Sequence, residues 1–372
     1  MPHSQRVLVC VTNDLVTDQR VHKMCLSLQR LGLEPLLVGR RRKHSLPLAP
    51  DARPYPTHRM RLWFDKGKLF YLEFNFRLFW WLLSKKAGYI NSNDLDTLLA
   101  CFWAARLKGV RLVYDSHEYF TQLPEVVTRP LTQKIWRTLE RWLFPKLKHT
   151  ATVSPQIQEA YEHEYGKRPV LIRNMPMYQP MPEIDFDARR RQKLLIYQGN
   201  LKKGRGVELM LQAMLHLPDY RLWLIGGGLW YENMLAYAKE LDLQEPQVKF
   251  FGLLPMEELP PLTLQASLGL SLEDTSSTNT RFALTNKFFD YIQARVPVLT
   301  SAELADQRAV VEQYGIGDLL YERSAAYLAE TIRAMVENRA AYMGYIQKME
   351  AAAEALCWDT QEDTIRQLYG VT

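Results

Sequence analysis

Short apolar runs alternate with amphipathic helical patterns along most of the chain. In the first half the strand-like runs lie at residues 6–11, 34–39, 88–91, 111–115, 150–154 and 170–173. In the second half they lie at residues 193–198, 220–225, 248–251, 268–272 and 297–300. This βαβα alternation predicts an α/β protein with two doubly wound domains, each built on a parallel sheet covered by helices.

The segments between these runs indicate the domain boundaries. Residues 176–191 are rich in Pro, Met and charge, and Pro176, Pro180 and Pro182 interrupt any regular element, so we expect a linker there. It would separate a domain over residues 1–175 from a second over residues 192–352. The tail from Ser324 to Leu368 has helical periodicity, which predicts at least two helices, with Trp358 anchoring the last one. We expect residues 353–372 to pack back toward the N-terminal domain.

Composition narrows the class of protein. The 372 residues are 47% hydrophobic, enough for two cores. The four cysteines are scattered without paired spacing, which argues against a disulfide framework and a zinc site and fits a reducing cytoplasm. The early strand at residue 6 leaves no room for a signal peptide, and no apolar run approaches the ~20 residues of a membrane span. A formal net charge of +6 favours an anionic partner, which could be a nucleotide, a nucleic acid or an acidic membrane surface.

The stretch from Asn286 to Ser301 carries the most informative chemistry. A buried strand at 268–272 is followed by a Ser/Thr/Asn-rich segment at 275–280, predicted to be an open loop, and a helix is predicted to begin near Asn286. Free backbone N–H groups and the helix dipole at that point favour an anion such as a diphosphate, and Lys287 adds a positive charge. Asp290 lies on the same helix face and could accept hydrogen bonds from a ribose diol. Taken alone, these residues fit a solvated Lys/Asp pair equally well.

Four groups of motifs occur in an order typical of one enzyme family. They are the first loop at 13–21; Tyr-Asp-Ser-His-Glu at 114–118; Thr-Val-Ser at 152–154 with Val-Leu-Ile-Arg-Asn at 170–174; and, in the second half, Tyr-Gln-Gly at 197–199, Lys-Gly-Arg-Gly at 203–206, Gly-Gly-Gly at 226–228, Phe-Gly at 251–252 and the stretch at 286–301. In this order and approximate spacing the chain resembles the retaining GT-B glycosyltransferases of group 1, family 4.

The resemblance implies a fold and an activity. The fold would be GT-B, with two Rossmann-like domains facing a central cleft and helices at the C-terminus. The first domain would bind the acceptor and the second the nucleotide sugar. The enzyme would move a sugar from a nucleotide-sugar donor to a glycan or lipid-linked acceptor in cell-envelope polysaccharide or glycolipid synthesis. It would be a hexosyltransferase that uses no metal and no other cofactor, with same-face displacement as its mechanism. We expect no nucleic-acid partner, because the basic residues gather in no recognised module.

The resemblance also assigns roles to individual residues. His117 would contact the donor sugar. Arg205 and Lys203 would be the candidates to meet the diphosphate, with Arg205 favoured, and Lys287 would add positive charge, because fixed cations can stabilise a departing diphosphate without a metal. The donor-binding set is Gly199, Asn200, Lys203, Gly228, Phe251, Asn286 and Asp290. The acceptor or first-loop set is Asp14, Asp18, Arg20 and Glu118, although Asp14 could equally cap a helix.

Some positions depart from the family pattern. Asn200 stands where many relatives have a second arginine, and Arg295 stands where a glycine is usual. Relatives often have two glutamates eight positions apart, whereas here the residue eight positions before Asp290 is Phe282. A catalytically silent nucleotide-sugar or glycan-binding protein would explain these departures. A sugar-nucleotide epimerase of the same fold is the other alternative, but no acid/base carboxylates for it can be identified.

Asp94-Leu95-Asp96 spells a DxD motif, which binds metal and nucleotide in other enzymes. It precedes a helical pattern, so we expect helix capping and dipole complementarity there rather than a metal site.

Aromatic and basic residues are interleaved in two segments of the first half. They lie between Arg59 and Lys86 and between Lys134 and Lys148. Such mixtures are typical of helices at a membrane interface. We therefore expect peripheral binding to the anionic inner face of the cytoplasmic membrane; the alternative is ordinary helix packing with an exposed basic rim.

Overall fold

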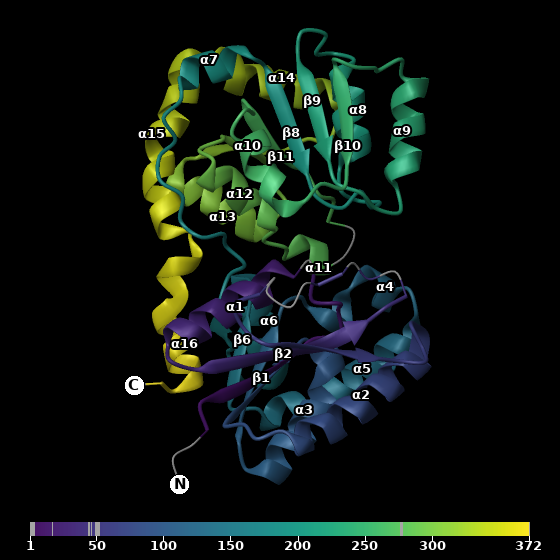
Figure 1. Cartoon of the computed structure of the whole chain (residues 1–372). Coiled ribbons are helices and arrows are strands. Elements are labelled where there is room, and N and C mark those ends of the chain that lie inside the picture. The colour runs from purple at the N-terminus through teal and green to yellow at the C-terminus, as the bar shows by residue number, and fades with distance from the viewer. Residues whose placement is uncertain are drawn as a thin grey trace. The chain divides into compact units, whose positions relative to one another are not determined.

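The computed structural model describes residues 4–16, 18–43, 45, 47–48, 53–275 and 278–371. The chain divides into two compact units. Unit 1 comprises Met1–Arg173 with Gln361–Thr372, and unit 2 comprises Asn174–Thr360. Each unit contains one sheet in which all paired strands are parallel (Figure 1). The prediction of two doubly wound α/β domains is therefore confirmed.

The sheet of unit 1 has seven strands in the order β3-β2-β1-β4-β5-β6-β7. Their bounds are β1 (Arg6–Cys10), β2 (Glu34–Arg41), β3 (Thr57–Arg61), β4 (Tyr89–Asn93), β5 (Arg111–Ser116), β6 (His149–Thr152) and β7 (Val170–Leu171). Leu8 of β1 pairs with Leu36 on one side and Ile90 on the other. Because helices cover parallel sheets, the central strands are almost continuously apolar, which is why the sequence pattern identifies them.

The helices of unit 1 are α1 (Gln19–Arg30), α2 (Gly67–Ser84), α3 (Leu95–Lys108), α4 (Pro124–Val127), α5 (Pro130–Leu143), α6 (Pro155–Tyr165) and α16 (Glu362–Tyr369), with 3₁₀ turns η1 (Phe120–Gln122) and η2 (Phe144–Lys146). Helices α2 and α3 cover the sheet face that carries Leu8 and Cys10. Helix α2 contributes a buried stripe at four-residue spacing, formed by Phe70, Phe74, Leu78 and Leu82. Among the described helices, none combines the length and apolar character needed to cross a membrane.

Helix α16 belongs to unit 1 although it lies at the other end of the sequence. Its residues Ile365, Leu368 and Tyr369 are buried, and the Tyr369 ring lies 6.0 Å from that of Tyr89 in β4. Gln361, just before the helix, donates from its amide to the Arg173 carbonyl at 2.9 Å. Unit 1 is thus assembled from two separate stretches of chain.

The sheet of unit 2 has six strands in the order β10-β9-β8-β11-β12-β13. Their bounds are β8 (Leu194–Gln198), β9 (Arg221–Ile225), β10 (Val248–Gly252), β11 (Leu268–Ser271), β12 (Val298–Ser301) and β13 (Gly317–Leu320). The helical elements are α7 (Phe186–Arg191), α8 (Val207–Met214), α9 (Tyr231–Glu240), η3 (Met256–Glu258), α10 (Leu259–Thr263), α11 (Thr278–Arg281), α12 (Asn286–Gln293), α13 (Ala305–Tyr314), α14 (Ala325–Glu337) and α15 (Arg339–Ala355). The 3₁₀ turn η4 (Trp358–Gln361) spans the boundary at which the chain returns to unit 1.

Alternate residues of β8 face different helix layers. Leu195 and Tyr197 pack in a core with residues of α8, α9 and α14, whereas Ile196 packs in a second core with residues of α12, α13 and α15. This alternation follows from the two-residue period of a strand. Two cores, one on each face, therefore hold the sheet between helix layers.

The structure differs from the predicted elements at four places. Strand β3 was not predicted because its sequence, Thr-His-Arg-Met-Arg, is mostly polar, and β13 is short with an aspartate. The stretch 176–191 runs within unit 2 and ends in α7, which contacts α14 and α15. The predicted open loop at 275–280 contains the one-turn helix α11, although residues 276 and 277 lie outside the described part.

Arg295 replaces the glycine that is usual at its position, and the structure shows how the arginine is held. Its backbone is in the left-handed region with φ +53°, which disfavours residues with a Cβ. Its side chain is fully buried, where Nη2 donates to the Gln179 carbonyl at 2.7 Å and to Glu350 of α15 at 2.7 Å. These bonds offset the backbone strain and join the end of α12 to α15.

We predict that Arg295→Gly destabilises unit 2 despite relieving the backbone strain. The change removes a buried guanidinium with all its bonds, so we expect the free energy of unfolding to fall by about 2–3 kcal/mol, measured by urea denaturation. Arg339→Ala, at an exposed arginine paired with Asp187, is the matched control and should have little effect. An Arg295→Gly variant as stable as the parent would contradict this account.

Candidate functional site

Arg20 and Asp115 form a buried ion pair at the C-terminal edge of the sheet in unit 1. Arg20, in the first turn of α1, donates from Nε and Nη2 to the two Asp115 oxygens at 3.1 and 2.7 Å. Its Nη1 also donates to the Ile172 carbonyl at 2.8 Å. Both side chains are almost fully buried. A two-point guanidinium–carboxylate contact of this kind fixes both groups, so Arg20 orients the carboxylate at the end of β5.

His117 lies between carboxylates at the same edge. Its Nε2 is 3.3 Å from Asp115 Oδ2 and 3.0 Å from Asn93 Oδ1, and its Nδ1 is 3.7 Å from Asp94 Oδ2. Burial alone would lower the pKa of His117, but Asp94 and then Asp115 raise it, to about 9. The pKa of Asp115 is lowered, because Arg20 and His117 outweigh the effect of burial. At neutral pH the imidazole is therefore protonated.

Asp94 does not act as the helix cap that the sequence suggested. It occupies the N-cap position of α3 but makes no capping hydrogen bond, and its backbone is left-handed with φ +57°. Its carboxylate instead accepts the backbone N–H of His117 at 2.8 Å. The capping prediction is wrong for Asp94 because a contact with β5, distant in sequence, takes the carboxylate.

Asp96 lies in the first turn of α3, as the dipole argument expected, and accepts a hydrogen bond from the Thr12 hydroxyl at 2.6 Å. Burial, with a further contribution from Asp94, raises its pKa to about 7. Among the described residues, no three His, Cys, Asp or Glu side chains are grouped so as to hold a metal ion.

The other first-loop residues have separate local roles. Asp18 caps α1, accepting from the Val21 N–H at 3.0 Å, and also accepts from Asn13 at 2.6 Å. Asp14 accepts a longer bond of 3.4 Å from the Val16 N–H, so the helix cap is Asp18. Glu118 is exposed, and its carbonyl accepts from the Ser116 hydroxyl at 2.9 Å. His117, Arg20 and Asp115 thus form the hydrogen-bonded cluster, with Asp14 and Glu118 on neighbouring loops.

In unit 2 the two predicted cations meet at a carboxylate that the sequence analysis missed. Glu273 follows β11 and is completely buried. Lys287 forms an ion pair with Glu273 Oε1, and Arg205 Nη1 lies 3.3 Å from the same oxygen. The Ser271 hydroxyl donates to the other oxygen at 3.0 Å. The sequence did carry a signal, because a glutamate directly after a buried strand lies at the sheet edge where ligands bind in α/β folds.

This cluster is ionised. Burial raises the pKa of Glu273, but Lys287 and then Arg205 lower it by more than burial raises it, to about 2. Burial lowers the pKa of Lys287, while Glu273 opposes that effect. The Lys287 ammonium also lies 4.5 Å from the centroid of the Tyr197 ring, a cation–π distance. Lys287 is only 6% exposed, so the alternative of a solvated Lys/Asp pair is wrong for this lysine.

Asp290 and Asn286 have other partners within unit 2. Asp290 accepts from the Gln198 amide at 2.9 Å, and the Gln198 carbonyl in turn accepts from Thr263 at 2.8 Å. Asn286, at the start of α12, accepts from the Asn174 amide at 2.7 Å. Asp290 is therefore tied to the end of β8, beside Gly199.

The predicted donor loops approach one another closely. A Cβ on Gly228 would lie 2.3 Å from Asn200 Oδ1, and a Cβ on Gly226 would lie 1.9 Å from the Gly199 carbonyl oxygen. Only glycine fits at such contacts. Gly199 and Asn200 are nevertheless exposed. The closely packed loops therefore lie at the surface.

Lys203 and Phe251 flank these loops. Lys203 is exposed, with its ammonium 6.0 Å from the Trp230 ring. Phe251 is half-buried and packs edge-to-face against Trp223 at 5.1 Å. Among the described residues, neither Lys203 nor Phe251 contacts the Glu273 cluster.

Two family models together match most of the chain. Residues 18–175 match the model described as Glycosyltransferase Family 4, and residues 182–354 match the model described as Glycosyl transferases group 1. No curated protein sequence is significantly similar to the chain.

Several solved structures have the same fold over their full lengths. A sucrose-phosphate synthase from Thermosynechococcus elongatus is 18% identical, with 98% of each chain covered and a TM-score of 0.77. HepE from Anabaena, in complex with UDP-glucose, is 15% identical, with 99% of this chain and 100% of that chain covered and a TM-score of 0.75. WaaG, a glycosyltransferase involved in lipopolysaccharide biosynthesis, is 14% identical, with 98% and 100% covered and a TM-score of 0.66.

The parallel strands of both sheets, the order of the motifs and these matches all indicate the same family. The chain belongs to glycosyltransferase family 4, group 1, and is a glycosyltransferase of the GT-B fold.

Proposed function

We propose that this enzyme moves a hexose from a nucleotide-sugar donor to a glycan or lipid-linked acceptor of the cell envelope, with Arg205 and Lys287 binding the donor diphosphate. The observation that carries the proposal is the convergence of both cations on Glu273 at the C-terminal edge of the unit 2 sheet. Developing charge on a departing diphosphate is stabilised best by cations already in place.

The two cations have different access. The Arg205 side chain is 29% exposed and reaches Glu273 from the loop after β8, whereas Lys287 is almost fully buried. An incoming diphosphate would therefore contact Arg205 directly, while Lys287 supplies positive potential from beneath Gly199. Glu273 holds both cations in place before the donor arrives.

Uridine is the base that we propose for the donor. HepE, a structural relative, is described in complexes with UDP, with UDP and glucose, and with UDP-glucose. Asp290, tied to Gln198 beside Gly199, is suited to accept hydrogen bonds from the ribose diol.

We predict that a UDP-sugar raises the melting temperature of the protein more than GDP- or ADP-sugars in a thermal-shift panel. At a ligand concentration of about 100 times Kd the stabilisation is roughly 2.7 kcal/mol, or several degrees. Arg205→Ala should abolish the shift, since its guanidinium is the exposed diphosphate contact. Lys287→Met combined with Glu273→Gln should also reduce it, and this double variant leaves no charge at either of the two deeply buried positions.

Lys239→Ala, at an exposed lysine of α9, is the matched control and should keep the full shift. If no nucleotide sugar stabilises the parent protein, the proposed donor site is wrong. Stabilisation without any hydrolysis or transfer would instead identify a nucleotide-sugar-binding protein.

His117 is suited to be a cationic hydrogen-bond donor toward the sugar rather than a general base. Its proton is held by the carboxylates of Asp94 and Asp115, and its side chain is 16% exposed. A protonated imidazole can donate to a sugar hydroxyl but has no lone pair to accept a proton.

We predict that His117 titrates near pH 9 in a ¹³C-histidine NMR titration, with His117→Gln used for assignment. Because its pKa is raised on folding, protonation of His117 stabilises the fold by up to about 3 kcal/mol below pH 6.5, and this contribution is lost as the pH rises through 9. Asp94→Asn should move the titration toward lower pH. A midpoint between 6 and 7 in the parent protein would contradict the assigned ion pairs.

We further propose that unit 1 binds the surface of an anionic membrane. Helix α2 carries a second apolar stripe, opposite its buried one, formed by Leu69, Leu72, Phe76 and Trp80. Leu72 and Phe76 are 68% and 66% exposed. Packing within the unit accounts for the buried stripe but leaves this one without a partner among the described residues.

Neighbouring groups extend this surface, which we call the α2 face. Trp63 is 84% exposed, and Arg77 lies over its ring at 4.6 Å. Tyr71 of α2 meets Trp136 of α5 edge-to-face at 5.1 Å, so α5, with its exposed Leu131 and Ile135, is adjacent. Aromatic groups among cations suit the headgroup region of an anionic bilayer.

We predict that the protein sediments with vesicles of phosphatidylcholine and phosphatidylglycerol at low salt. The double variant Phe76→Ser, Trp80→Ser should lose most of this binding, because it removes apolar surface that would enter the interface. Leu215→Ser with Tyr321→Ser removes exposed apolar groups of unit 2 and should bind normally. Absence of vesicle binding by the parent protein would disprove the α2 face as a membrane surface.

A further inference from the structure

A pocket of about 470 Å³ lies in unit 1 between the end of α3 and the first residues of β5 and β6. Its lining includes Phe102, Arg106, Arg111, Lys146, Lys148 and His149. It opens at the N-terminal edge of the sheet, whereas Asp115 and His117 lie at the C-terminal end of β5. The pocket is therefore separate from the residues proposed for catalysis.

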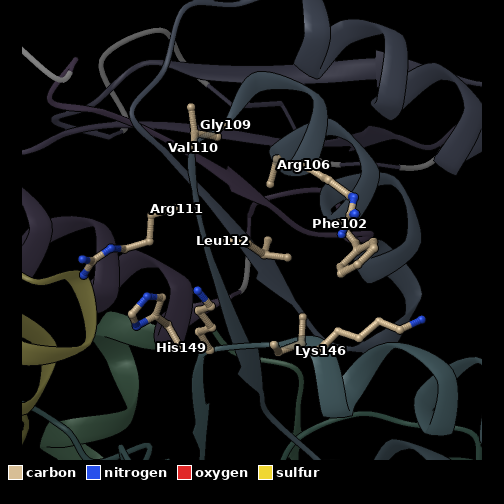
Figure 2. Close-up of a pocket in the computed structure, with 11 residues that line it drawn as sticks. Phe102, Arg106, Gly109, Val110, Arg111, Leu112, Lys146 and His149 are labelled. Carbon is tan, nitrogen blue, oxygen red and sulfur yellow. The ribbon is translucent and has the colours of Figure 1, made fainter. Parts of the chain in front are cut away.

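The lining of this pocket is cationic on both sides of the sheet edge. Figure 2 shows Arg111 and His149 on one side of Leu112, and Arg106 and Lys146 on the other. None of the lining residues, all of which the structure describes, is acidic. Four permanent charges thus share one cavity.

These cations differ from the paired cations of unit 1. Arg30 pairs with Glu362 and Arg168 with Glu162. In the described part of the chain, by contrast, no ion pair or side-chain hydrogen bond is formed by Arg106, Arg111, Lys146 or Lys148. The Lys146 ammonium lies instead over the Trp142 ring at 4.4 Å.

The cations of the lining also affect the pKa of the neighbouring His149. The pKa of His149 is lowered, first by burial and then by Arg111 and Lys148. Like charges gathered in a cavity repel one another unless an anion offsets them. Arg106 also lies in the last turn of α3, where a cation complements the helix dipole, but Arg111, Lys146 and Lys148 lie outside that helix.

Arg111 lies against the residue that follows α16. A Cβ on Gly370 would lie 2.2 Å from Arg111 Nη1, and Gly370 has a left-handed φ of +62°. The guanidinium thus lies directly against the backbone of Gly370 in the C-terminal segment, and a larger residue there would have to displace it.

We propose that this pocket binds a phosphate-bearing anion, distinct from the donor diphosphate of unit 2. Several cations around one cavity match an anion with two or more charges and several oxygens, such as a phosphate monoester or a diphosphate, better than a single carboxylate. Phe102 and Leu112 give the cavity an apolar wall that can contact an organic group next to the phosphate.

The proposal is tested with inorganic pyrophosphate and isothermal titration calorimetry at physiological ionic strength. The titration is carried out on Arg205→Ala, which weakens the proposed donor site. We expect binding by Arg205→Ala, and roughly tenfold weaker binding once Lys146→Ala and Lys148→Ala are added. Adding Lys239→Ala and Lys249→Ala instead removes the same charge from unit 2 and should leave the affinity unchanged.

Equal affinities with and without the two pocket substitutions, or no binding to Arg205→Ala, would overturn the proposal. Because Lys146 and Lys148 are exposed, their variants should fold, and an unchanged melting temperature verifies this. This comparison does not depend on whether unit 2 binds a nucleotide sugar, since every titrated protein carries Arg205→Ala and differs only at the substituted lysines.

A second measurement distinguishes a soluble phosphate ester from a lipid headgroup. Vesicles of phosphatidylcholine with phosphatidic acid are sedimented with the parent protein and with the Lys146→Ala, Lys148→Ala variant. If pyrophosphate competes with these vesicles and the variant binds them less, the phosphate is that of a lipid. If pyrophosphate binds to the pocket but vesicle binding is the same for both proteins, the ligand is a soluble phosphate ester.

Discussion

The ion pairs of one buried carboxylate, Glu273, organise the C-terminal edge of the unit 2 sheet. A charge removed from water is tolerated only when oppositely charged groups and hydrogen bonds surround it. Glu273 meets this condition by joining the end of β11 to the start of α12 through Lys287 and to the loop after β8 through Arg205. Asp115 has the corresponding position in unit 1, where Arg20 of α1 and His117 surround it. In each unit, a paired carboxylate at the sheet edge links segments that lie far apart in the sequence.

Most central strands could be predicted from sequence because burial on both faces leaves a continuous apolar run. The edge strands β3 and β13 could not, because a strand with one neighbour keeps polar side chains such as those of Arg59 and Asp318. The motifs also pointed to Lys287 and Arg205, which the structure brings together at Glu273. Their partner Glu273 stayed hidden because the contact joins positions 14 and 68 residues apart, a distance that no local pattern spans.

Predictions from neighbouring residues in the sequence were least reliable where contacts with distant residues compete. Asp94 has the position of a helix cap, yet its carboxylate bonds to His117 of the neighbouring strand end. Helix α2 presents the opposite difficulty, because both of its faces are apolar and the sequence cannot tell which is the core. The structure shows that Phe70 and Phe74 are buried while Leu72 and Phe76 are exposed. An apolar residue in a helix such as α2 therefore does not by itself show whether the fold buries it.

The assembly of unit 1 from two stretches of chain has a consequence for how the protein folds. Tyr369 and Leu368 fill part of the core of unit 1, but they follow the whole of unit 2 in the sequence. Contacts between residues so far apart slow folding, because a long loop must close before they form. During synthesis, unit 2 can complete its core while unit 1 still lacks α16. Of the two units, the one whose synthesis begins first is therefore completed last, and the apolar surface that α16 covers stays exposed to solvent until then.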